Sequence, residues 1–204
     1  LHNEEDLVVG MDMPFFNPDD TPQHKSDLWP HADQNIKLKK GCENSYQGIL
    51  YVWDSTQKNT SNTVVLPKSW NNEYYELLSA TPESFGTGLA HGLYIRDVPD
   101  ASIMNSLMDK WKKNARRIQV PAGALLIFNS RTIHQGFPSG YRLAQTLSWE
   151  PKSCRSEEVF INKVKLLNMG IGTTHWASLG IQHGASFTRF KKDEKYCNYH
   201  NGCV

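Results

Sequence analysis

Residues 29–35, WPHADQN, place a histidine and an aspartate two positions apart. Imidazole and carboxylate groups are both ligands for divalent metal ions, and in an extended segment this spacing lets His31 and Asp33 reach the same ion. The stretch also contains proline and asparagine, which are typical of turns, so a loop without a ligand is the alternative interpretation. A metal site therefore needs a third ligand from elsewhere in the chain.

His134 is the best candidate for that third ligand. It lies in VPAGALLIFNSRTIHQG, residues 120–136, where a Pro-Ala-Gly turn begins an apolar strand and polar residues precede the histidine. Two imidazoles and one carboxylate on one face of Fe(II) hold the ion and leave the opposite face open for O2 and a cosubstrate. His31, Asp33 and His134 are therefore the expected metal ligands and catalytic residues.

Arg142 is the candidate anchor for an acidic cosubstrate. Within YRLAQTLSWEP (141–151), period-2 geometry places it on the same face as Ala144, Thr146 and Ser148. A guanidinium there can bind a carboxylate through paired, charge-assisted hydrogen bonds, with the neighbouring hydroxyls assisting. A dicarboxylic oxo acid such as 2-oxoglutarate would chelate the iron at one end and be bound by Arg142 at the other. Without Arg142, structural roles for the two histidines would be the preferred interpretation.

Short strands with flanking helices are expected to position these residues. The apolar runs predict strands over 7–16, 46–54, 63–67, 116–120, 124–128 and 141–151, with a short segment at 132–134 and turns at 17–20 and 121–123. Residues 55–62 are polar and predict a loop. Many short strands separated by turns favour a mainly β protein with flanking helices, built as a double-stranded β-helix, the jelly-roll or cupin-like arrangement.

Helices are predicted over 71–80, 100–115 and 155–168. The clearest is residues 100–115, where Asp100 can cap the N-terminus and Ile103, Leu107 and Trp111 recur every four residues. This stripe predicts packing against the core rather than a binding surface.

Composition is that of an ordinary globular domain, with 204 residues, 39% hydrophobic residues and a formal net charge of +1. No apolar run approaches the roughly 20 residues that span a membrane. The start, LHNEEDLVVG, has no initiator Met and resembles no signal peptide. We expect one domain over 1–204, shortened at its N-terminus, with an irregular C-terminal extension over 177–204.

The cysteines predict reduced thiols in a cytoplasmic or nuclear protein, because they are too few and too scattered for a disulfide scaffold. They are Cys42, Cys154, Cys197 and Cys203. The tail CNYHNGC offers Cys197, His200 and Cys203 as metal ligands. Their spacing fits no common zinc pattern, so a frayed terminus is the preferred interpretation.

Three stretches of the sequence resemble one known family. HADQN (31–35), YQGILYVWDSTQKNTSNTVVLPKSW (46–70) and VPAGALLIFNSRTIHQGFPSGYR (120–142) are similar to the phytanoyl-CoA dioxygenase-like branch of the Fe(II)/2-oxoglutarate-dependent oxygenase superfamily. Members typically show His-x-Asp-Gln, a Gln-Gly strand and a distal Ser-Arg-Thr-x-His followed by arginine. GTTHW (172–176) also resembles a C-terminal stretch of some relatives, so the resemblance extends in pieces over residues 29–176.

The resemblance implies a double-stranded β-helix with Fe(II) bound by His31, Asp33 and His134. It implies 2-oxoglutarate bound by Arg142, with Gln47 as a second contact and O2 as the other cosubstrate. The implied reaction is hydroxylation of a C–H bond in a small-molecule substrate, with succinate and CO2 as coproducts and ascorbate as a candidate reductant.

Two departures from the family pattern bear on the substrate. Trp70 stands where the family has a histidine, and Asn129 stands where aspartate is common. The loop before Trp70 also lacks the usual Gly-Gly. These differences leave the expected metal ligands in place.

Structural roles are the alternative for several other residues. Arg131 is expected in a salt bridge, and His175 either has a structural role or lines the substrate pocket. The aromatic rings of Trp29, Tyr51 and Trp53 are expected in the core or in the wall of a substrate cavity.

Two other functions stay open. The basic stretches KWKKNARR (110–117) and RFKK (189–192) could follow the phosphates of a nucleic acid, so an oxygenase acting on methylated bases is the first alternative. A non-catalytic jelly-roll binding module is the second. The presence of all three ligands and Arg142 favours an enzyme over that module.

Overall fold

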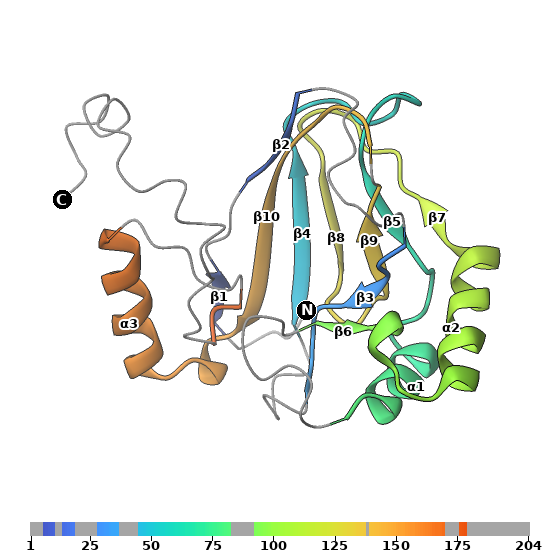
Figure 1. The fold of residues 1–204 in the computed structure, drawn as a ribbon. Coiled ribbons are helices and arrows are strands. Elements are labelled where there is room, and N and C mark those ends of the chain that lie inside the picture. Colours follow the sequence, from blue (N-terminus) through green and yellow to red (C-terminus); the bar gives the residue numbers. More distant parts are fainter. Residues whose placement is uncertain are drawn as a thin grey trace.

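Two antiparallel β-sheets and three α-helices form the part of the chain that the computed structural model describes (Figure 1). The described residues are 6–10, 14–18, 28–36, 45–82, 92–137, 139–169 and 176–178. The protein is therefore mainly β with flanking helices, as the sequence predicted. Within these ranges no helix has the length and apolar character needed to cross a membrane.

The first sheet is built around β10 (Arg142–Pro151). β4 (Tyr46–Tyr51) pairs with β10 along one side, and β8 (Leu125–Asn129) pairs with β4. On the other side, β1 (Leu7–Gly10) pairs with the end of β10 and β2 (Pro14–Asn17) with its start.

The second sheet consists of strands of only two or three residues. Its order is β6 (Leu93–Tyr94), β3 (His31–Ala32), β9 (His134–Gly136), β5 (Thr63–Val65) and β7 (Arg116–Arg117). Such short strands cannot bury much apolar surface themselves, so the second sheet depends on the helices that cover it.

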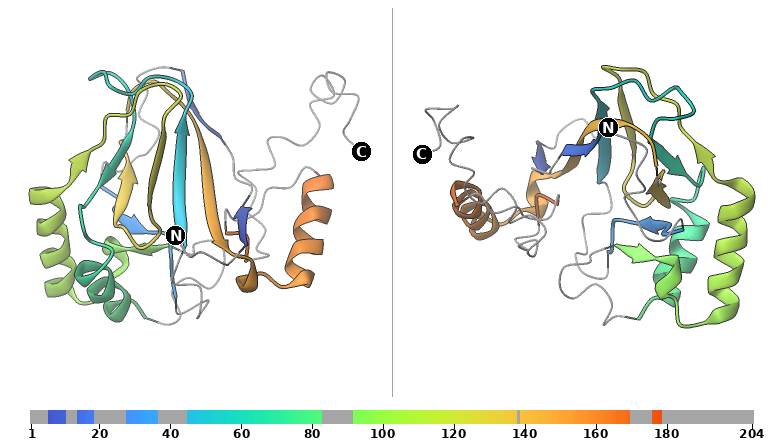
Figure 2. Two further views of the ribbon diagram at one scale, coloured as in Figure 1. Left: turned by 180° about the vertical axis from the view of Figure 1, so that it is seen from behind. Right: turned by 45° about the horizontal axis from the view of Figure 1, so that its top comes forward.

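Helices α1 (Asn72–Ala80) and α2 (Ala101–Asn114) lie together on the side of the second sheet, far from α3 (Glu157–Asn168), which lies beyond β1 (Figure 2). Asp100 caps α2 as predicted, because its side chain accepts hydrogen bonds from the backbone N–H groups of Ser102 and Ile103. Two short 3-10 helices, Ile95–Asp97 and Lys152–Cys154, follow β6 and β10.

The larger of the two apolar clusters lies between these helices and the second sheet. The predicted stripe of α2 contributes to it through Leu107 and Trp111, which confirms the packing role of that stripe. The buried members are Ala32, Leu66, Tyr74, Leu77, Leu78, Leu93, Ile95, Val98, Leu107, Trp111 and Ile133. The smaller cluster, on the first sheet, contains Ile49, Tyr51, Val120 and Ala144.

Several strand boundaries differ from the prediction. The strand expected over 7–16 is observed as two strands, β1 and β2. β4 ends at Tyr51 because the N–H groups of Val52 and Trp53 both donate to the carbonyl of Leu143. The strand expected over 116–120 is limited to β7, since the end of that segment bonds to the loop at Ser55 instead.

Candidate metal centre

The second sheet brings His31 and His134 together. His31 on β3 is paired directly with His134 on β9 in an antiparallel ladder. Paired residues project from the same face of a sheet, and Asp33 follows β3 two positions after His31. The register of two very short strands therefore makes all three side chains converge.

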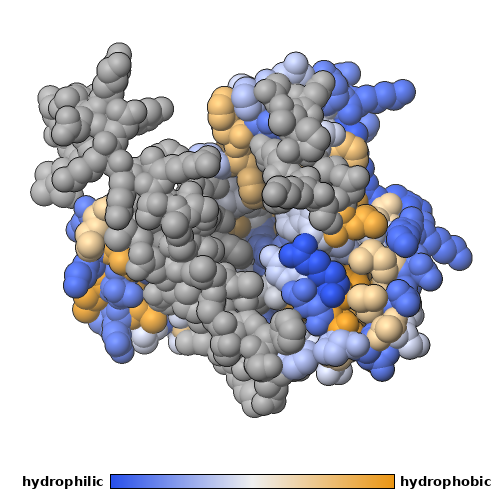
Figure 3. Space-filling model, viewed as in Figure 1, coloured by the Kyte–Doolittle hydropathy of each residue, from blue (hydrophilic) through white to orange (hydrophobic). Residues whose placement is uncertain are grey.

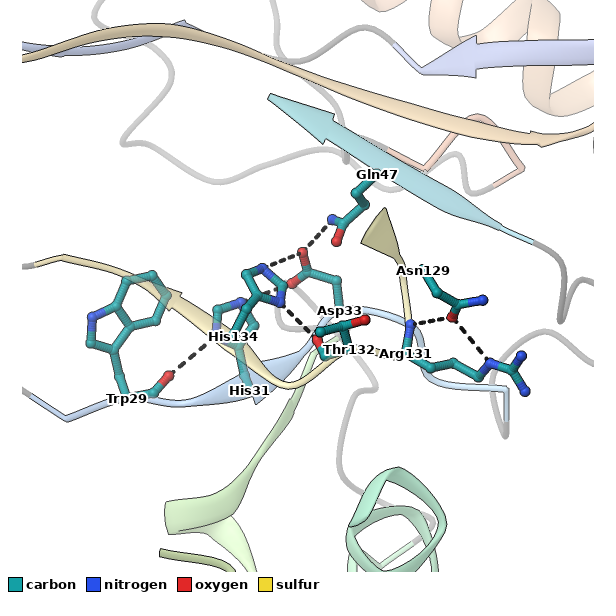
Figure 4. Close-up of polar contacts among 8 residues, drawn as sticks. All are labelled: Trp29, His31, Asp33, Gln47, Asn129, Arg131, Thr132 and His134. Atoms are coloured by element: carbon teal, nitrogen blue, oxygen red, sulfur yellow. Dashed lines mark hydrogen bonds and ion pairs between the residues drawn. The ribbon is translucent and has the colours of Figure 1, made fainter. Parts of the chain in front are cut away.

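The three side chains form a compact group that could hold a metal ion. Their ligand atoms all lie within 4.8 Å of one another. Nε2 of His31 is 3.0 Å from Oδ1 of Asp33, and Nε2 of His134 is 3.5 Å from Oδ2 (Figure 4). Both histidines are buried and Asp33 is half-buried, so competition from bulk water is limited.

Backbone carbonyl groups orient both imidazoles. Nδ1 of His31 lies 3.1 Å from the carbonyl oxygen of Trp29, and Nδ1 of His134 lies 2.9 Å from that of Thr132 (Figure 4). A carbonyl oxygen can only accept, so each Nδ1 carries the hydrogen. In a neutral imidazole, the lone pair of each Nε2 then faces the carboxylate of Asp33.

This arrangement of lone pairs fits a cation. Two Nε2 lone pairs directed at a carboxylate repel it, whereas a divalent ion placed among them attracts all three groups. A backbone carbonyl that accepts from Nδ1–H is also one of the common partners that orient metal-binding histidines in proteins. The residues present therefore fit a divalent metal.

Aromatic rings cover the His31 imidazole. Trp29 stacks on it at a centroid distance of 4.8 Å and Tyr94 at 4.9 Å, with interplanar angles of 16° and 19°. The guanidinium of Arg96 lies 4.9 Å from the Tyr94 ring centroid. Burial, and secondarily the charge of Asp33, raise the pKa of Tyr94. These rings restrict the orientation of the His31 imidazole.

Gln47 connects the two sheets at the candidate metal centre. From β4 of the first sheet, its side-chain amide donates a hydrogen bond to Oδ2 of Asp33 (Figure 4). The family resemblance implied Gln47 as a contact of the cosubstrate. The structure places it in the cavity lining and in contact with the candidate ligand Asp33, a contact that local sequence could not indicate.

A cavity of about 270 Å³ lies between the sheets. His31, Asp33 and His134 line it from the second sheet, while Gln47 and Arg142 line it from the first. Its other described walls are largely aromatic and apolar. They include Phe15, Trp29, Ile49, Phe128, Phe137 and Leu147. A candidate metal centre and a buried cation thus share one cavity.

Arg142 has no carboxylate within ion-pair distance among the described residues, and its Nε has no hydrogen-bond partner there. Its side chain is buried, and burial lowers its pKa, while the adjacent Tyr51 acts in the opposite direction. Thr146, on the same face of β10, also lines the cavity. Ser148 shares that face but is fully buried and is not among the described cavity-lining residues.

Arg131 lies outside the described cavity lining. Its guanidinium donates to Asn129 (Figure 4). It also donates to the Tyr75 hydroxyl and lies 5.9 Å from the ring centroid of the half-exposed Trp70. Among the described residues no acidic side chain pairs with it, so the predicted salt bridge is not observed there. The two departures from the family pattern, Trp70 and Asn129, thus both contact Arg131.

The predicted aromatic residues have different environments. Trp29 lines the cavity, and Tyr51 is fully buried with its hydroxyl 2.9 Å from Thr63 Oγ1. Trp53 is exposed and makes an edge-to-face contact with Phe16.

Two basic residues of the 110–117 stretch make contacts within the protein. Lys110 pairs with Glu76 at 2.8 Å, and Arg117 donates to Asn62 and to three backbone carbonyls of the 55–62 loop. The stretch therefore offers fewer free cations to a phosphate backbone than its sequence indicates.

Cys154 is disulfide-bonded, which contradicts the expectation of reduced thiols. Single-sequence reasoning missed this pairing because the cysteines follow no recognisable spacing. The other three cysteines, His175, His200 and residues 189–192 lie outside the described residues. Of the C-terminal region, residues 176–178 are described and buried, and Ser178 donates to the buried carboxylate of Glu150.

Comparison with known proteins gives no family assignment: no protein-family model matches the chain, and no curated protein matches it.

Proposed function

We propose that the protein is an Fe(II)- and 2-oxoglutarate-dependent dioxygenase that hydroxylates a C–H bond of a small molecule. We also propose that its two sheets form a double-stranded β-helix. The observation that carries the functional proposal is the shared cavity. It contains two imidazoles and a carboxylate arranged for a cation, together with a buried arginine that has no carboxylate partner among the described residues.

Each residue has a defined task in this proposal. His31, Asp33 and His134 would hold Fe(II) on one side and leave coordination positions open toward the cavity. Arg142 would bind the far carboxylate of 2-oxoglutarate, which offsets the cost of its own burial. When bound, Fe(II), 2-oxoglutarate and O2 supply the oxidising chemistry, with succinate and CO2 as coproducts. Gln47 would hold Asp33 in its ligating orientation, and the aromatic walls would exclude water.

The test is an anaerobic titration of the protein with Fe(II) and then 2-oxoglutarate, monitored for the weak visible charge-transfer band of the chelate. Wild-type protein is expected to develop the band. Arg142→Ala should keep the iron but need much more 2-oxoglutarate, because the paired hydrogen bonds to the far carboxylate are lost. Arg116→Ala is the matched control, since Arg116 is exposed and lies on β7, outside the described cavity lining.

A negative result in this titration would distinguish the alternative functions. Folded protein that binds no metal would indicate a binding module without this chemistry. Metal binding without the band would indicate a different cosubstrate. A nucleic-acid substrate would require salt-dependent DNA or RNA binding, and the internal contacts of Lys110 and Arg117 weaken that alternative.

A further inference from the structure

We propose that Phe15, on β2, is a positioning residue for the carboxylate that Arg142 binds. The inference rests on the proposed function, in which that carboxylate belongs to 2-oxoglutarate. It adds a residue from the N-terminal part of the chain, far in sequence from Arg142.

The register of the first sheet brings Phe15 to Arg142. Phe15 on β2 and Tyr51 on β4 are both paired with Ala144 on β10, one from each side. Paired residues share a face, so both aromatic rings lie on the face that also carries Arg142, two positions before Ala144. The small, fully buried Ala144 leaves space over β10 in which the guanidinium contacts both rings.

The distances confirm these contacts. Cζ of Arg142 lies 4.4 Å from the ring centroid of Phe15 and 5.5 Å from that of Tyr51. A ring against the face of a planar guanidinium leaves its N–H edge available for a carboxylate. Phe15 and Arg142 both line the cavity, so a ligand held there would meet the guanidinium and the ring together.

Phe15 is also far more exposed than the Arg142 side chain that it contacts. Its side chain is 41% exposed, whereas that of Arg142 is 6% exposed. Apolar surface is visible over β2 (Figure 3). A carboxylate is attracted more strongly to a cation when water is excluded. Phe15 therefore fixes the orientation of the guanidinium and shields the ion pair that forms on binding.

The adjacent Phe16 provides a matched control. It has the same side chain on the same strand, but it faces the other side of β2, is 58% exposed and makes an edge-to-face contact with Trp53. Phe16 is not among the described residues that line the cavity. Phe16→Ala therefore removes the same atoms from β2 without touching Arg142.

The experiment measures 2-oxoglutarate binding to Zn(II)-loaded protein by calorimetry, which needs no turnover. Phe15→Ala is expected to raise the Kd about tenfold, in the range that a desolvated cation–π contact allows, with Zn(II) affinity unchanged. Phe15→Trp retains an aromatic face and should restore the Kd to within about threefold of wild type. Phe15→Leu retains apolar bulk alone and should be intermediate. Phe16→Ala should match wild type.

The binding measurements distinguish failure of the role of Phe15 from failure of the proposed function. Equal Kd values for Phe15→Ala and Phe16→Ala, whether both unchanged or both raised, would overturn the role of Phe15 while leaving the proposed function intact. A loss of Zn(II) binding in Phe15→Leu would also overturn it, because the effect would then be on the fold. If wild-type protein binds Zn(II) but not 2-oxoglutarate, the proposed function fails and this inference fails with it.

Discussion

His31 and His134 are directly paired across β3 and β9, and their ring centroids lie 4.6 Å apart. One ladder position thus sets the separation of two candidate ligands that are far apart in sequence. Since β3 and β9 have only two and three residues, a bound ion would in turn stabilise their pairing.

Metal binding is therefore expected to stabilise the folded protein. At a free metal concentration of one hundred times Kd, the gain in free energy of unfolding is about 2.7 kcal/mol, if the ion binds only the folded state. Thermal unfolding with Fe(II) under argon, or with Zn(II), should show a higher Tm than in chelator. Asp33→Ala and His134→Ala should abolish the shift, while Asp97→Asn should retain it. A shift that persists in Asp33→Ala would contradict the ligand assignment.

Gln47→Leu is expected to weaken metal binding by about tenfold to a hundredfold, because the carboxylate of Asp33 loses the donor that orients it. Competition with a chromophoric chelator measures this change directly. Gln119→Leu is the control, since Gln119 is exposed and donates to a loop carbonyl outside the cavity. Equal metal affinities for the two variants would show that the bond between the sheets does not position Asp33.

Short-range sequence patterns predicted the helices and side-chain groups that are specified within one segment of the chain. Asp100 and the stripe of Leu107 and Trp111 specify α2 within one segment, and the structure agrees closely. The His31 and Asp33 spacing, combined with the setting of His134, correctly identified three side chains that converge. Residue chemistry was sufficient there because few residue types bind metals.

Contacts between distant segments were not predictable from one sequence. The two-residue β6 has no periodicity of its own and exists because Leu93 and Tyr94 pair with β3. The bond from Gln47 to Asp33 and the contact of Phe15 with Arg142 depend on how the two sheets are placed and registered. These contacts follow from the tertiary fold, so no local sequence pattern predicts them.

Arg117 is expected to stabilise the 55–62 loop rather than bind nucleic acid. Its guanidinium donates to Asn62 and to the carbonyls of Gln57, Lys58 and Thr60. Arg117→Ala should lower the free energy of unfolding by about 2 kcal/mol, as measured by urea denaturation.

Arg116→Ala is the matched control for this substitution. The Arg116 side chain is exposed and donates to the neighbouring carbonyl of Ala115, so the change should cost less than about 0.5 kcal/mol. Similar losses for the two variants would show that the loop contacts of Arg117 contribute little.

Gly136 offers a way to narrow the cavity beside Arg142 without changing a ligand. A Cβ atom there would lie 3.5 Å from Nη1 of Arg142 and 3.5 Å from the Trp29 ring, which is ordinary contact, so Gly136→Ala should be tolerated. Gly136→Val adds two methyl groups at this point, and valine suits a strand. We expect it to weaken 2-oxoglutarate binding about tenfold, because overpacking displaces the guanidinium, while metal binding is retained. Unchanged 2-oxoglutarate affinity, measured by calorimetry on Zn(II)-loaded protein, would mean that the cosubstrate does not occupy the space between Trp29 and Arg142.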